Sequence, residues 1–232
     1  MSIIKLHLLI LLCIITTTEC YRTSFQQSSY ADQQGESTYT IMLCPQGDSK
    51  VAGRTTPDGA ERGVTRLWAE QIKKALEENN PNIRVVFSHN LGEHIGQKEK
   101  ANFANRLQIN LFISLLCYTT DNLSISLYCY GNKNSCMMVQ PKKLSFCPYN
   151  LAYTFSASIT PQYTNLIYNN FLHNPQLKNI AIQQPIYAPL NCLMGIKAPA
   201  IAIEAGLKQS QDWRYYVRAV TEALHSLMEQ LL

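Results

Sequence analysis

The sequence has few charged residues, no clustered basic segment and no internal repeat. Of its 232 residues, 16% are charged and 46% are hydrophobic, which excludes a disordered chain and favours one folded domain of ordinary size. The net charge of +4 is not gathered into a basic stripe, so we do not expect nucleic acid as a partner.

The sequence also lacks an apolar run near its N-terminus that is long enough to cross a membrane. Residues 6–15 form an apolar run of about ten residues, whereas a membrane span needs roughly twenty. A lysine precedes this run, and small residues follow it at 16–20, which is typical of a cleaved signal peptide. We therefore predict a signal peptide over residues 1–20 and a protein that is exported, periplasmic or secreted, with no membrane span in the mature chain. Cys20 leaves a lipidated N-terminus as an alternative.

No two cysteines have the two-residue spacing of a zinc knuckle, which argues against a cysteine-based metal site. Of the eight cysteines, Cys13 and Cys20 lie in the signal peptide, which leaves six for an exported domain where disulfides can persist. One disulfide among Cys129, Cys136 and Cys147 fits their close spacing, and buried thiols are the alternative.

Residues 21–39 are mostly polar and predict a flexible tether, followed by a folded domain over 40–232. In that domain, apolar runs alternate with helical patterns. The strands are predicted near 40–44, 83–88, 111–117, 124–130 and 199–203, and the helices near 61–79, 96–107, 150–171 and 212–231.

This alternation predicts an α/β fold, a single domain with a twisted, mainly parallel sheet and helices on both faces. The strands near 40–44, 83–88, 111–116 and 199–203 are expected to be central, because each is apolar on both faces. Ligands bind beyond the carboxyl ends of such strands. Those ends are predicted at Cys44, Ser88, Leu116 and Glu204.

Glu204 is notable because it directly follows the apolar run Ala-Pro-Ala-Ile-Ala-Ile and precedes Ala-Gly. A carboxylate there costs desolvation free energy unless it is paired, solvated or used. It is either a general acid or base in apolar surroundings, or a residue that caps a turn or forms a salt bridge.

Several short motifs occur in a familiar order along the domain. They are Ile-Met-Leu-Cys-Pro-Gln-Gly from residue 41, Glu-Arg-Gly-Val from 61, Ala-Asn at 104–105, Asn-Leu-Phe-Ile-Ser from 110 and Pro-Ala-Ile-Ala-Ile-Glu-Ala-Gly from 199. In their order and spacing, residues 40–232 resemble the zinc-dependent N-acetylmuramoyl-L-alanine amidases, which cut the bond between muramic acid and the stem peptide of peptidoglycan.

The resemblance implies a zinc ion held by histidine, glutamate and histidine, with a water molecule in the open position. Glu61 matches the glutamate ligand, and Glu204 matches the catalytic glutamate that handles the proton. It also implies peptidoglycan or its fragments as the partner, and it places Glu61 and Glu204 close together at the carboxyl edge of the sheet.

The sequence departs from the family at both histidines, because Gly47 and Leu116 stand in their places. Neither side chain can bind a metal, so we expect no zinc at the family site and a degenerate amidase-fold protein that acts on or binds peptidoglycan. The alternative is an active amidase with a rearranged zinc site, which leaves open whether the protein is an enzyme. Substitute ligands for that alternative are Asp48, His89, His94 and Cys117. Restoring histidine at 47 and 116 is expected to complete a three-ligand set with Glu61.

Five tyrosines in the second half of the sequence have two possible roles. They either line a glycan-stacking surface or belong to the ordinary core and rim, and they are Tyr118, Tyr128, Tyr130, Tyr149 and Tyr153.

Overall fold

The strands form where the apolar runs predicted them. The computed structural model describes residues 38–131 and 147–231, so the predicted signal peptide, most of the tether and Cys136 lie outside the described residues. Tyr39, assigned to the tether from the sequence, is a buried residue and begins the first strand.

The strands are β1 (Tyr39–Pro45), β2 (Thr55–Thr56), β3 (Gly59–Ala60), β4 (Ile83–Phe87), β5 (Leu111–Thr119), β6 (Ser124–Cys129), β7 (Ala181–Ile182), β8 (Ile186–Tyr187) and β9 (Ala200–Leu207). The main sheet has the order β4-β1-β5-β9-β6-β7, with β8 also paired to β6, while β2 and β3 form a separate hairpin. Pairs β1–β4, β1–β5 and β5–β9 are parallel, and β6 runs antiparallel to β9. The predicted α/β fold with a mainly parallel sheet is therefore confirmed.

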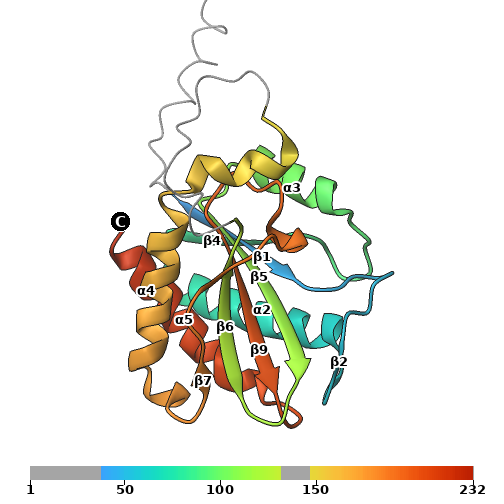
Figure 1. Ribbon diagram of the computed structural model, residues 1–232, viewed down its shortest axis with the longest axis vertical. Coiled ribbons are helices and arrows are strands. Elements are labelled where there is room, and N and C mark those ends of the chain that lie inside the picture. The colour runs from blue at the N-terminus through green and yellow to red at the C-terminus, as the bar shows by residue number, and fades with distance from the viewer. Residues whose placement is uncertain (1–37, 132–146, 232) are drawn as a thin grey trace, which may run out of the picture. The chain divides into compact units, whose positions relative to one another are not determined.

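Helices cover both faces of the sheet, as Figure 1 shows. One face packs against α2 (Glu61–Asn79), α4 (Thr160–His173) and α5 (Trp213–Glu229), through side chains such as Trp68 and Tyr216. The other face packs against α3 (Gln97–Arg106) and the short 3₁₀ helix η4 (Asn191–Leu193). Within 38–131 and 147–231, none of the helices has both the length and the apolar character of a membrane span.

The structure corrects three predicted details. Residues 150–171 are not one helix, because the 3₁₀ helix η2 (Tyr149–Ser156) ends before α4 begins at Thr160. Strand β4 lies at the edge of the sheet rather than in its centre.

The third correction concerns the carboxyl ends of two central strands. Strand β5 continues to Thr119 and β9 to Leu207, so Leu116 and Glu204 lie within strands rather than after them. They are direct neighbours in the β5–β9 ladder.

Candidate functional site

A short hairpin brings Arg54 to Glu61. The antiparallel pair β2–β3 aligns Thr55 with Ala60, so the residues that flank them, Arg54 and Glu61, lie opposite each other. The backbone N–H of Glu61 donates to the carbonyl oxygen of Arg54 at 2.8 Å, which closes the hairpin directly before α2.

Arg54 binds Glu61 through both its backbone and its side chain. The Nε and Nη2 atoms of Arg54 lie 3.3 and 2.9 Å from the two carboxylate oxygens, and its backbone N–H donates to Oε2 at 2.9 Å. The backbone N–H of Cys117 on β5 donates to Oε1 at 2.9 Å. Glu61 is only 2% exposed and is the first residue of α2, where the helix dipole also favours a negative charge. Its buried carboxylate is thus well supplied with donors.

The same guanidinium reaches Glu204. Arg54 Nη1 lies 2.7 Å from Glu204 Oε1, and the hydroxyl of Tyr128 donates to Oε2 at 2.7 Å. The pairing of β6 with β9 places Ser126 opposite Glu204. Tyr128 lies two residues after Ser126 on β6, so its side chain is on the same face of the sheet as that of Glu204. The structure therefore brings Glu61 and Glu204 together, with a cation between them.

The charges in this group reinforce one another. Burial alone would lower the pKa of Arg54, but hydrogen bonds to Glu61 and Glu204 and their negative charges raise it above its ordinary value. Burial and the hydrogen bond to Glu204 raise the pKa of Tyr128 to about 12, so its hydroxyl stays protonated as a donor. The ring of Tyr118 lies with its centroid 5.4 Å from Arg54 Cζ, a cation–π contact.

Gly47 and Leu116 have no donor atom in their side chains. Gly47 has φ = +89°, and a Cβ atom there would lie 2.6 Å from Cβ of Arg62 and 2.9 Å from the carbonyl oxygen of Val51. Leu116 is partly buried beside Glu204. Any side chain at position 47 would therefore be strained.

Asp48 and His94 form a side-chain contact with each other. His94 Nδ1 lies 2.8 Å from Asp48 Oδ2, while Oδ1 accepts the backbone N–H groups of Lys50 and Val51. Desolvation would raise the pKa of Asp48, but these hydrogen bonds and the contact with His94 lower it to about 2. The pair serves the loop after β1 rather than Glu61.

His89 and Cys117 do not join the carboxylates either. Nδ1 of His89 lies 2.9 Å from the hydroxyl of Ser88, and burial, with the nearby charge of Lys100, lowers the pKa of His89. His89 lines a pocket with Gly47. Burial and the charge of Glu61 raise the pKa of the Cys117 thiol to about 12.

The donor set does not fit a zinc ion. Across residues 38–131 and 147–231, no group of three His, Cys, Asp or Glu side chains is arranged to hold a metal. Zinc sites in enzymes need three protein ligands and an open position. Here, the space between the two carboxylates holds a guanidinium.

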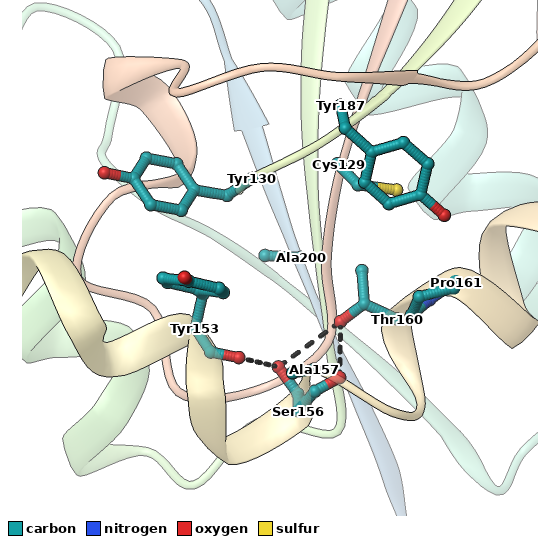
Figure 2. A pocket seen from close by; sticks show the side chains of 9 residues that line it. All are labelled: Cys129, Tyr130, Tyr153, Ser156, Ala157, Thr160, Pro161, Tyr187 and Ala200. Atoms are coloured by element: carbon teal, nitrogen blue, oxygen red, sulfur yellow. Dashed lines mark hydrogen bonds between the residues drawn. The ribbon is translucent and has the colours of Figure 1, made fainter. Parts of the chain in front are cut away.

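The five tyrosines named from the sequence do not form one surface. Tyr118 and Tyr128 belong to the Arg54 group, whereas Tyr130 and Tyr153 face each other with ring centroids 5.1 Å apart. Figure 2 shows the pocket that this second pair lines, with Tyr187 opposite. Ala200, the first residue of β9, also lines it, so this pocket lies at the other end of the strand from Glu204.

Arg54 is the residue of this group that the sequence did not reveal. The signal was the stretch Thr-Thr-Pro-Asp-Gly-Ala at 55–60, because Pro-Asp-Gly favours a tight turn between two short extended pieces. Such a turn places the residue before it beside the residue after it, here Arg54 and Glu61.

The chain matches a known protein family. The family model described as N-acetylmuramoyl-L-alanine amidase matches residues 41–220, which contain both carboxylates, Arg54 and all of β1 to β9 except the first two residues of β1. The chain belongs to this amidase family. No curated protein sequence matches it.

Solved amidase structures share the fold. The catalytic domain of CwlV from Bacillus (Paenibacillus) polymyxa var. colistinus is 12% identical with a TM-score of 0.60, over 83% of this chain and 99% of that domain. AmiC2 of Nostoc punctiforme is 14% identical with a TM-score of 0.59, over 84% of this chain and 99% of its own. Ami1 from Mycobacterium smegmatis is 14% identical with a TM-score of 0.58, over 84% and 100%. At these identities, the likeness shows the amidase fold alone.

Proposed function

We propose that this protein is an exported member of the amidase family that binds peptidoglycan without hydrolysing it. The observation that carries the proposal is Arg54, whose guanidinium contacts the carboxylates of both Glu61 and Glu204 at 2.9 and 2.7 Å. A metal ion that used these carboxylates would have to displace a cation that is already bound to them.

Within this proposal, Glu61 takes the position of the family's glutamate ligand and Glu204 that of its catalytic glutamate. Gly47 and Leu116 take the positions of the two histidines, and neither has a lone pair to donate to a metal. Hydrolysis by this family's chemistry needs a metal-bound water that is activated next to the scissile amide. Without ligands for the metal, the protein is left with a site that can recognise the substrate but has no activated water.

Family membership supports peptidoglycan as the partner. The solved relatives are named as N-acetylmuramoyl-L-alanine amidases, and the match spans most of the domain. The signal peptide predicted at residues 1–20 would bring the protein to the compartment that contains peptidoglycan.

A rearranged zinc site, the alternative from the sequence, has less support. Among its candidate ligands, Asp48 and His94 contact each other at 2.8 Å, and the Cys117 thiol is buried. His89 is hydrogen-bonded to Ser88. An active metalloenzyme would need such side chains to gather around Glu61, and no group of three possible metal ligands occurs within 38–131 and 147–231.

Three measurements on the purified mature protein test the proposal. The protein is prepared with zinc in the medium and its zinc content is measured by mass spectrometry. It is then mixed with purified peptidoglycan sacculi, and both co-sedimentation and release of stem peptides are followed. The catalytic domain of CwlV, prepared in the same way, is the positive control for release.

We expect co-sedimentation with sacculi, no release of stem peptides and zinc far below one ion per chain. One zinc ion per chain together with hydrolysis that a chelator abolishes would overturn the proposal in favour of the rearranged site. Absence of co-sedimentation would overturn peptidoglycan binding itself.

A further inference from the structure

Arg54 still has donors to offer after it has bound both carboxylates. A guanidinium has five N–H donors. Three of them are used for Glu61 and Glu204, and the other two have no hydrogen-bond partner within 38–131 and 147–231. The Arg54 side chain is 43% exposed, so part of it is open to a ligand from solvent.

The surroundings restrict how a ligand can approach. The Tyr118 ring contacts the guanidinium, and a hydrogen bond of 3.0 Å between its hydroxyl and Ser124 Oγ holds the ring in place. Glu61 occupies the edge of the guanidinium formed by Nε and Nη2. A ligand oxygen must therefore approach in the plane of the guanidinium, at the N–H groups of Nη1 and Nη2 that remain.

The charge of the group decides which kind of oxygen is preferred. Two carboxylates and one guanidinium leave one net negative charge when both carboxylates are ionised. A ligand carboxylate would gain from Arg54 but would be repelled by Glu204 and Glu61 at similar range. A neutral carbonyl oxygen accepts from the guanidinium without that repulsion.

We propose that Arg54 is the ligand-binding cation of this site and that it donates to an amide carbonyl oxygen of a muramoyl peptide. The proposal rests on the proposed binding of peptidoglycan and names the chemical group that is recognised. A side chain of the protein thereby replaces a metal ion as the partner of the amide oxygen. It differs from a metal in that it has no coordination site at which to activate water, so the amide is held and not cleaved.

A pair of small ligands tests the preference for a neutral oxygen on the unaltered protein. The methylamide of N-acetylmuramic acid has an amide carbonyl on its lactyl group and no carboxylate, whereas N-acetylmuramic acid has a carboxylate at the same place. By calorimetric titration, we expect the amide ligand to bind roughly tenfold or more tightly than the acid, the range that one charge-assisted hydrogen bond supports. Equal or tighter binding of the acid would overturn the preference.

A variant tests Arg54 itself. Arg54→Lys keeps the positive charge but cannot present the planar set of donors. We expect it to weaken binding of the amide ligand by roughly tenfold or more. Arg218→Lys is the matched control, because Arg218 lies on α5, is exposed and is also paired with a glutamate, and we expect no change.

The outcomes separate this inference from the proposed function. Unchanged binding by Arg54→Lys, with its folding verified by thermal melting, would overturn the role of Arg54. If that variant does not fold, titration of the unaltered protein, with the side-chain ¹⁵N resonances of Arg54 followed by NMR, decides: resonances that do not shift on binding the amide ligand overturn the inference. Binding of sacculi without binding of the amide ligand would overturn the inference and leave the proposed function standing. Binding of neither would overturn both.

Discussion

The two ends of strand β9 border two regions of the described residues, one with charged side chains and one without. In its carboxyl half, Glu204 is tied to Arg54 and Tyr128 in a charged group. At its amino end, Ala200 borders a pocket whose lining has no charged side chain among the described residues and in which Tyr153 packs against another tyrosine. In Figure 1, the yellow segment that contains η2 lies toward the amino end of β9.

The difference indicates which region has a use beyond folding. Aromatic packing at the amino end stabilises the domain without a polar cost. At the carboxyl end, Glu61 is only 2% exposed. A buried ion pair stabilises a fold little more than apolar side chains of similar volume would. A region built at that cost is the better place to look for ligand binding, and it lies at the carboxyl ends of the parallel strands, where α/β sheets bind ligands.

The largest expected effect comes from removing Glu61. Glu61→Ala leaves the Arg54 guanidinium without its bidentate partner and leaves the N–H of Cys117 unpaired. We expect a loss of about 2–4 kcal/mol in the free energy of unfolding, because charge-assisted hydrogen bonds are lost and a buried N–H is left unpaired, although Arg54 keeps its contact with Glu204. Urea denaturation followed by tryptophan fluorescence measures it, since Trp68 and Trp213 are both buried.

Glu70→Ala is the control for that measurement. Glu70 is also on α2 and also pairs with an arginine, Arg66, but its side chain is 46% exposed. Exposed pairs of this kind contribute about 0–1 kcal/mol. Equal losses for the two variants would show that the Arg54 group is an ordinary surface pair and would end the contrast between the two ends of β9.

The fold could be predicted well from the sequence because its signals are local. Strands β1 and β5 are continuous apolar runs, and α2 has apolar residues at helical spacing, so their positions follow from residue patterns alone. The break between η2 and α4 was missed because apolar residues continue through it, and only Pro161 near the start of α4 signals a new helix.

The candidate site was only half predictable. The two carboxylates could be named from motifs, and the sheet brings them together as expected. Arg54 could not be named in that way, because its role depends on a hairpin of two-residue strands, too short to produce a periodic pattern. The cation between the two carboxylates was missed for the same reason, since Arg54 lies outside every motif.

An effect of intermediate size is expected when histidine is introduced at positions 47 and 116. The sequence alone suggested that Gly47→His with Leu116→His would complete a metal site with Glu61. The structure argues against this, because position 47 has φ = +89° and no room for a Cβ atom. In addition, the carboxylate of Glu61 is already bound to Arg54. We expect the double variant to bind zinc at well below one ion per chain and to lose roughly 1–3 kcal/mol of stability through backbone strain.

Zinc content by mass spectrometry and urea denaturation provide the two readings, with Leu116→His alone as the control without strain. Adding Arg54→Ala to the double variant frees the carboxylates and should raise the zinc content above that of the double variant. Stoichiometric zinc in the double variant with unchanged stability would show that the loop after β1 adapts and that Arg54 yields to a metal.

The smallest effect is expected at the tyrosine pocket. Tyr153→Ala removes one partner of the tilted pair with Tyr130, at 5.1 Å and 56°, and we expect it to cost about 1–2 kcal/mol of stability. Binding to peptidoglycan sacculi should stay unchanged, because the pocket lies at the other end of β9 from Glu204. Tyr153→Phe, which keeps the ring, is the control and should change neither quantity. Weaker co-sedimentation of Tyr153→Ala with full binding by Tyr153→Phe would place a glycan-stacking surface at the amino end, because a sugar stacks on the ring and not on the hydroxyl. In that case, the charged end would serve the peptide and the tyrosine end the glycan, and both regions would belong to one extended binding surface.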